Sequence, residues 1–216
     1  MSGSLSLTDR DEQILQALCV RIRLMTLAQI AGHWWAGNKR QTEDARRRLA
    51  ALVQAGYLTR STALAAPLPP MNGPVIAWSP GEPEPDAGAV AWRLQSRWRE
   101  SPRVVRVYLA TALATRVFGG KAQGRLKQEY QATHDLGVSK MYLDLRLRSP
   151  KLAEAWIGED ILAPYRRGQK LPDAIIAESP EHSPTLVLEF GGAYDKPRVE
   201  AFHNDCRNRG VPYEIW

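Results

Sequence analysis

The chain has 216 residues, with 44% hydrophobic and 24% charged side chains, an ordinary composition for a globular protein of one large or two small domains. Its net charge of +6 favours a polyanionic partner. We find no leader pattern and no apolar run of membrane-spanning length, so we expect a soluble, cytoplasmic protein. Cys19 and Cys206 lie far apart without a surrounding metal-ligand cluster, and we expect two buried thiols rather than a disulfide.

The first part of the chain predicts three helices. Thr8 and Thr26 are expected N-cap residues, and apolar residues recur on one face of the helix that follows Thr8. A third helix is expected from about Arg40 to Ala55, with Gly56 ending it.

Two short strands, at 57–60 and 74–78, are expected to follow and to pair with each other. Three helices followed by two strands are the order of a winged helix-turn-helix, so we predict such a DNA-binding domain over residues 1–80. This segment carries nine Lys or Arg against five Asp or Glu, which agrees with a polyanionic partner.

The third helix would be the one offered to the major groove of double-stranded DNA. Its exposed polar positions form the predicted DNA-binding surface: Lys39, Arg40, Gln41, Thr42, Arg46 and Arg47. The first three are expected to reach base edges and the last two to contact phosphates. Arg48 stays ambiguous, because successive residues turn about 100° around a helix and three adjacent arginines cannot all face the DNA. The alternative is a solvated charged face used for protein contacts or dimerisation.

Residues 81–133 predict a linker and a helical connector. The Pro-rich and acidic stretch at 79–86 can continue neither a strand nor a helix. Both 87–100 and 104–118 are compatible with helices, although β-branched residues make 104–109 equally compatible with a strand.

Residues 134–216 predict a second domain. A helix is favoured over a strand at 138–147, and the expected elements after it are strands at 155–159, 172–177 and 184–190, a helix to 209 and a strand at 211–216. Helix, three strands, helix, strand is the smallest core of the restriction-endonuclease-like, or PD-(D/E)xK, fold. We therefore predict an α+β or α/β protein with a C-terminal αβββαβ domain.

Two acids in this domain suggest a metal site. Asp173 precedes one predicted strand and Glu189 ends the next, which brings both carboxylates to one sheet edge, where they could bind Mg²⁺. The nuclease pattern continues Glu-x-Lys, but here the Lys position is Gly191. We therefore favour a nuclease-like domain that has lost catalysis.

Other side chains are candidates to complete the set. Lys196, or alternatively Lys140, is a candidate for the missing catalytic lysine. His134, Asp144 and Glu159 are candidate acids or bases. Each has a structural alternative: Lys140 and Asp144, four residues apart, are equally compatible with a surface pair on a helix.

Short motifs along the chain point to one family. They are LTDRDEQIL at 7–15, ARRRL at 45–49, GYL at 56–58, HDL at 134–136, PDA at 172–174 and LE at 188–189. On these the chain resembles the replication-relaxation proteins of bacterial plasmids and other mobile elements. The resemblance implies a winged helix joined to a nuclease-like domain, with a role in plasmid replication or its control.

The expected function is DNA binding by a homodimer, since winged-helix operators are usually two-fold symmetric. Binding would need no cofactor. The alternative is a Mg²⁺-dependent DNA nickase or endonuclease that uses Asp173 and Glu189. A third possibility is a non-catalytic interaction module of a mobile-element or defence system.

Overall fold

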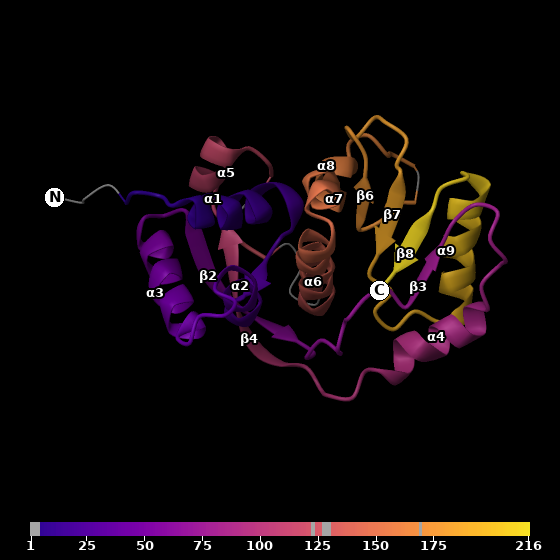
Figure 1. Cartoon of the computed structure of the whole chain (residues 1–216), viewed down its shortest axis with the longest axis horizontal. Coiled ribbons are helices and arrows are strands. Elements are labelled where there is room, and N and C mark those ends of the chain that lie inside the picture. The colour runs from indigo at the N-terminus through magenta and orange to yellow at the C-terminus, as the bar shows by residue number, and fades with distance from the viewer. Residues whose placement is uncertain (1–4, 122–123, 127–130, 169) are drawn as a thin grey trace. The chain divides into compact units, whose positions relative to one another are not determined.

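A computed structural model describes residues 5–121, 124–126, 131–168 and 170–216, and it is a mixed α+β structure (Figure 1). The contacts divide it into two units, Met1–Ala66 with Pro102–Ser139 (unit 1) and Pro67–Ser101 with Lys140–Trp216 (unit 2). Each unit thus uses two separate stretches of chain, whereas we expected the consecutive ranges 1–80, 81–133 and 134–216. None of the described helices is both long and apolar enough to cross a membrane.

The helices of unit 1 are α1 (Asp9–Gln16), a π-helical turn η1 (Ala17–Arg21), α2 (Leu27–Trp34), α3 (Gln41–Gln54), α5 (Ala112–Phe118) and the first half of α6 (Ala132–Arg148). The Thr8 and Thr26 side chains accept hydrogen bonds from the backbone N–H groups of Asp11 and Gln29, which confirms both N-caps. Ile14, Ile30 and Leu49 are fully buried between these helices.

The sheet of unit 1 differs from our expectation. Its strands are β1 (Met25–Thr26), β4 (Arg103–Ala110) and β2 (Leu58–Ala65), in the order β1-β4-β2. β2 pairs with β4 along its whole length, from Leu58↔Ala110 to Ala65↔Arg103, so the prediction that 57–60 pairs with 74–78 was wrong. The segment 104–109, which the sequence left open between helix and strand, belongs to the strand β4. Its pairing with β2 over eight consecutive residues stabilises the extended conformation.

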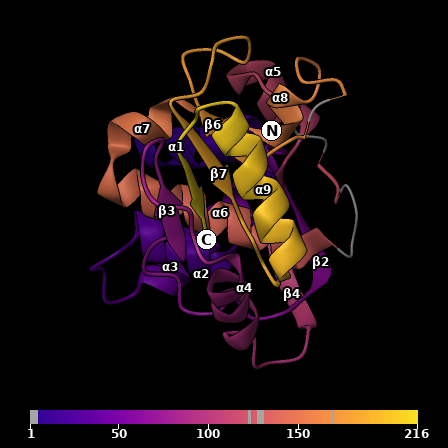
Figure 2. The same ribbon diagram turned by 90° about the vertical axis from the view of Figure 1, so that its right-hand side faces the viewer.

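Unit 2 contains a five-stranded sheet in the order β3-β8-β7-β6-β5. Its strands are β3 (Ile76–Trp78), β5 (Trp156–Gly158), β6 (Ala174–Ile176), β7 (Leu186–Glu189) and β8 (Tyr213–Ile215). Neighbours are antiparallel except β7 and β8, which are parallel and joined through α9 (Lys196–Asn208) (Figure 2). The segments expected as strands after residue 150 therefore all contain one.

Helices cover both faces of this sheet. α9 and α4 (Ala87–Ser96) lie on one face, where Phe202 and Leu94 belong to the same buried cluster as Val187 of β7. On the other face the second half of α6 places Tyr142 against Trp156, with ring centroids 5.4 Å apart. Two short helices, α7 (Pro150–Glu154) and α8 (Glu159–Leu162), flank β5 and were not predicted.

The helix expected at 138–147 is confirmed as part of α6. Cys19 and Cys206 are free and buried, as expected. Burial raises the pKa of the Cys19 thiol to about 11 and is the main cause that raises that of Cys206 to about 12.

Gly120 touches the backbone of η1 so closely that no side chain fits there. Its backbone has φ +88°, and a Cβ atom would lie 1.8 Å from the carbonyl oxygen of Cys19. That oxygen also accepts a hydrogen bond from the Lys121 N–H, at 3.3 Å. The segment after α5 therefore docks on the π-helical turn only because residue 120 is glycine.

We expect Gly120→Ala to lower the free energy of unfolding by about 2 kcal/mol or more, because it adds both backbone strain and an overlap with a backbone atom. Urea denaturation would measure this. Gly32→Ala is the control: Gly32 is exposed in α2 with nothing within 4 Å of the added Cβ, so it should be neutral or stabilise by roughly 0.5 to 1 kcal/mol. Equal effects of both substitutions would contradict the role of Gly120.

Candidate functional site

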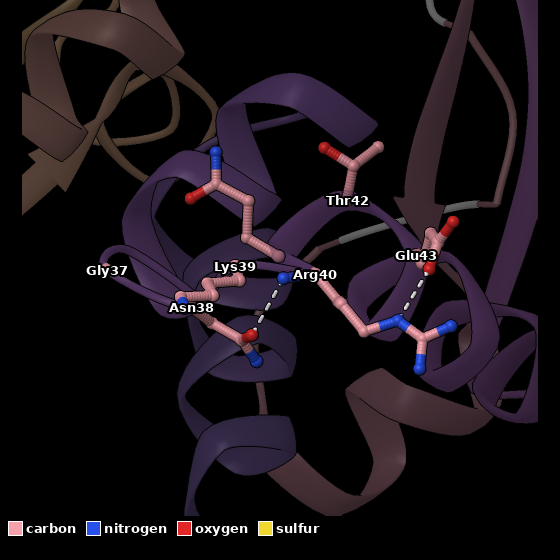
Figure 3. A pocket seen from close by; sticks show the side chains of 7 residues that line it. Gly37, Asn38, Lys39, Arg40, Thr42 and Glu43 are labelled. Carbon is pink, nitrogen blue, oxygen red and sulfur yellow. Dashed lines mark hydrogen bonds and ion pairs between the residues drawn. The ribbon is translucent and has the colours of Figure 1, made fainter.

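The predicted DNA-binding residues lie at the start and on the exposed face of α3. We call this set (Lys39, Arg40, Gln41, Thr42, Arg46 and Arg47) the α3 surface. Its N-terminal part lines an open hollow of about 650 Å³ together with Gly37, Asn38 and Glu43 (Figure 3). Asn38 shapes this turn, because its Oδ1 accepts from the Arg40 N–H at 2.8 Å.

The cations of the α3 surface are exposed and at most loosely paired. Arg40 Nε lies 3.0 Å from Glu43 Oε2, and Arg47 Nη2 lies 3.0 Å from Asp44 Oδ1. The Arg40 and Arg47 side chains are 77% and 83% exposed, and such surface pairs stabilise by about 1 kcal/mol at most. Lys39 and Arg46 form no ion pair with another described residue. All four cations can therefore contact an anionic ligand at little cost.

Arg48, which the sequence left ambiguous, is turned inward. Its Nε lies 2.9 and 3.0 Å from the two carboxylate oxygens of Asp11, and its Nη2 donates to the Ser6 carbonyl at 2.7 Å. Asp11 is fully buried, and its carboxylate also accepts from the Thr8 hydroxyl at 2.7 Å. Burial alone would raise the pKa of Asp11, but the bonds from Arg48 and Thr8 outweigh it and lower that pKa. Arg48 thus joins α3 to α1.

A second basic surface, which sequence reasoning missed, lies on the outward face of β2 and β4. Its exposed residues are Arg60, Thr62, Leu64, Val104 and Arg106. Thr62 is opposite Arg106 and Leu64 is opposite Val104, and the two apolar side chains are 58% and 73% exposed. The spacing of Val104 and Arg106 could have indicated this surface, because residues two apart lie on the same face of a strand. That reading requires knowing that 103–110 is a strand.

The acid pair, Asp173 and Glu189, does come together at one edge of the unit 2 sheet. The Asp173 N–H donates to Glu189 Oε2 at 3.2 Å, and the Phe190 N–H donates to Asp173 Oδ2 at 2.7 Å. The Tyr194 hydroxyl donates to Glu189 Oε1 at 2.5 Å. Each carboxylate therefore accepts a hydrogen bond from a backbone N–H at or next to the other acid. These two hydrogen bonds connect the start of β6 to the end of β7.

The buried position of Glu189 changes its acidity. Glu189 is only 4% exposed, and burial, reinforced by the nearby charge of Asp173, raises the pKa of Glu189 to about 8. This shift favours the protonated form of Glu189, and the Asp173 N–H and the Tyr194 hydroxyl donate to its two oxygens. In the described part of the chain no three His, Cys, Asp or Glu side chains converge on one point.

Gly191, at the position of the missing lysine, is packed inside unit 2. A Cβ atom there would lie 2.6 Å from Ile215 Cγ2 and about 3.0 Å from the Leu94 methyl groups. A lysine at 191 would begin in the apolar core that α4 and β8 form. A side chain at position 191 would therefore disturb the packing of this unit.

The candidate replacement lysines both pair with other acids. The Lys196 ammonium lies 3.6 Å from Glu200 of the next helical turn. Lys140 donates to Asp144, as the surface-pair alternative predicts, and to the Met71 carbonyl. A cation whose charge does act on Glu189, lowering its pKa, is Lys170, which precedes Asp173 and was not among the predicted candidates.

The remaining candidates lie as follows. His134 Nδ1 is 3.7 Å from Asp135 Oδ1 in unit 1. Glu159 begins α8, and its backbone N–H donates to the Asp173 carbonyl at 2.9 Å, which places Glu159 next to the acid pair.

The raised pKa of Glu189 predicts a pH-dependent stability. Between about pH 4.5 and 8 the folded state holds a proton that the unfolded state has released, so this group stabilises most at low pH and its contribution is lost as pH rises through 8. Glu189→Gln cannot ionise, so it lacks this pH dependence. We expect the free energy of unfolding of Glu189→Gln, relative to that of the parent, to increase steadily from pH 5 to pH 8.

Chemical denaturation at several pH values would measure the difference. Glu200→Gln, the same change on an exposed side chain of unit 2 that pairs with Lys196, is the matched control and should run parallel to the parent. A constant offset between Glu189→Gln and the parent would mean that Glu189 is ionised in the folded protein.

Comparisons with family models, with curated proteins and with solved structures find no match to this chain. The resemblance to replication-relaxation proteins therefore stays a prediction from the short motifs, and the function has to be argued from the residues described above.

Proposed function

We propose that this chain binds double-stranded DNA through the α3 surface and serves replication or transcriptional control of a plasmid or other mobile element. The observation that carries the proposal is the division of labour along α3. Arg46 and Arg47 are exposed, whereas the adjacent Arg48 is bound to buried Asp11. A helix that is fixed to the domain by its buried face and is basic on its exposed face suits the major groove.

The order of elements in unit 1 supports this proposal. Three helices followed by the paired strands β2 and β4, with β1 as third strand, match a winged helix-turn-helix whose second wing strand follows a long insertion. Arg60 and Arg106 on those strands would then add phosphate contacts beside α3. A homodimer, which would match a two-fold symmetric operator, is part of the proposal.

Unit 2 is proposed to be a PD-(D/E)xK-like domain that no longer cleaves. The antiparallel strands β5, β6 and β7, the crossover through α9 and the parallel strand β8 have the order of that fold. The raised pKa of Glu189 and the packed Gly191 favour a structural role for these residues. The implied role in replication comes from the motif resemblance alone.

The adjacent arginines should separate binding from stability. We expect Arg46→Ala/Arg47→Ala to weaken binding to duplex DNA at least about tenfold and to flatten the dependence of log affinity on log salt by roughly two counterions, with little loss of stability. Fluorescence anisotropy over a salt series would measure this.

Arg48→Ala is the matched control. It leaves the buried Asp11 carboxylate without its cation and should lower the free energy of unfolding by about 2 to 3 kcal/mol. DNA binding that survives Arg46→Ala/Arg47→Ala unchanged, salt dependence included, would contradict the proposed surface.

The alternative, a Mg²⁺-dependent nickase, is favoured by one observation only, the proximity of the two acids Asp173 and Glu189. We expect supercoiled plasmid to stay intact with Mg²⁺ or Mn²⁺ at protein concentrations that shift the DNA. Nicking by the parent that disappears in Asp173→Ala/Glu189→Ala would establish the enzyme instead.

A further inference from the structure

Trp92, in the middle of α4, differs from the other six tryptophans of the chain. Its side chain is 69% exposed. Five of the others are at most 9% exposed, and the half-buried Trp98 donates its indole N–H to the Gly192 carbonyl at 2.8 Å. Tryptophan is highly buried on average, so an exposed one at the centre of a helix calls for an explanation.

The two faces of α4 have different surroundings. α4 packs beside α9 (Figure 2), and its inward side chains Val90, Ala91 and Leu94 belong to the buried core of unit 2. The outward side consists of four exposed residues spaced i, i+3, i+4 and i+7, so they form one stripe along the helix. We call this stripe the α4 face: Ala89, Trp92, Arg93 and Ser96.

The neighbours of Trp92 on the helix surface are too small to cover its ring. Ala89 precedes it by one turn, Ser96 follows it by one turn, and Gly88 has no side chain. The ring therefore projects between small residues. Moreover, the four positions of the α4 face have the spacing of a hole that receives a side chain from a facing helix. One face thus offers both the projecting ring and the space to receive one, as a two-fold symmetric contact requires.

The charges that flank Trp92 are also complementary to each other. The exposed acids Glu82, Glu84 and Asp86 precede α4, whereas Arg93, Arg97 and Arg99 follow Trp92. The acids are held at the helix start, because Glu84 pairs with Arg207 and Asp86 caps the helix. Trp92 lies about midway between Asp86 and Arg99.

This charge pattern selects one orientation for a second copy of the chain. In an antiparallel pair of α4 helices centred on Trp92, the acidic end of each helix lies opposite the basic end of the other. A parallel pair would place like charges together at both ends, and like charges facing each other across an interface are unfavourable.

We propose that the α4 face is the interface of a homodimer, in which the α4 helices of two copies pack antiparallel with their Trp92 rings side by side. The proposal rests on the proposed function only for the homodimer, which it locates on unit 2. Arg93 of each copy would contact the Trp92 ring of the other through a cation–π interaction. One helix face is small beside the roughly 1,600 Å² of a standard interface, so we expect a weak, reversible dimer.

A strand of nucleic acid is the other occupant to consider, because bases stack on exposed aromatic rings and arginines attract phosphates. The acids disfavour it, since Glu82, Glu84 and Asp86 would repel phosphates along one half of the helix. A second copy matches both ends of α4, whereas a polyanion matches only one.

The first test measures the oligomeric state of the full chain without DNA, by sedimentation velocity over a series of protein concentrations. We expect a monomer–dimer equilibrium whose dissociation constant rises at least about tenfold in Trp92→Ala. Leu147→Ala is the matched control, because Leu147 is 68% exposed in the same unit but lies outside the α4 face, and it should leave the equilibrium unchanged. Trp92→Ala should melt like the parent at concentrations where both are monomeric.

The second test determines the orientation with a short bis-maleimide crosslinker. In the antiparallel pair, position 89 of one copy lies near position 96 of the other, so a mixture of Ala89→Cys and Ser96→Cys should crosslink and either variant alone should not. The native Cys19 and Cys206 are buried, and the parent should not react. Crosslinking of each variant with itself would contradict the antiparallel arrangement.

Two results would overturn the proposed interface. A dimer that Trp92→Ala leaves intact would place the homodimer elsewhere on the chain. A parent that stays monomeric at every concentration would exclude the dimer, and single-stranded DNA binding that Trp92→Ala abolishes would then identify nucleic acid as the occupant. Neither result depends on the α3 surface, which the duplex binding of Arg46→Ala/Arg47→Ala tests separately.

Discussion

The burial of the Asp11 carboxylate determines how unit 1 presents its basic residues. Asp11 lies at 0% exposure and keeps its charge only because Arg48 and Thr8 donate to it. This ion pair fixes α3 against α1 and removes Arg48 from the exposed face. Of three consecutive arginines, one therefore holds the fold and two remain for a ligand. Neighbouring residues of one helix therefore have different roles: Arg48 stabilises the fold through its ion pair, and Arg46 and Arg47 stay exposed.

Unit 2 also buries a carboxyl group, that of Glu189, but there the environment raises the pKa, whereas that of Asp11 is lowered. Burial of Glu189, together with the nearby charge of another acid, Asp173, raises its pKa to about 8. The turn after β7 packs around this group, with Tyr194 donating to it and Gly191 allowing Leu94 and Ile215 to close over the backbone. The glycine at position 191 and the buried glutamate are two parts of one packing arrangement.

Local signals explain what the sequence could predict. Capping threonines and apolar periodicity located the helices of unit 1, and short apolar runs located β6 and β7 with Asp173 and Glu189 at one edge. The partner of β2 could not be predicted, since strand propensity is local whereas pairing is decided by a ladder with a segment 38 or more residues away. The raised pKa of Glu189 could not be predicted for a similar reason, because its main cause is burial, which depends on how the whole of unit 2 packs.

The interleaving of the two units follows from the same long-range pairing. β4 lies between β1 and β2, so the range 1–80 lacks the central strand of its own sheet. The range 134–216 lacks β3, which pairs with β8, and α4, whose Leu94 packs over Gly191. The segment 67–101, expected in large part as a linker and connector, supplies both elements to unit 2. What looked like a connector is therefore a structural part of the second unit, because β3 extends its sheet and α4 covers the turn after β7.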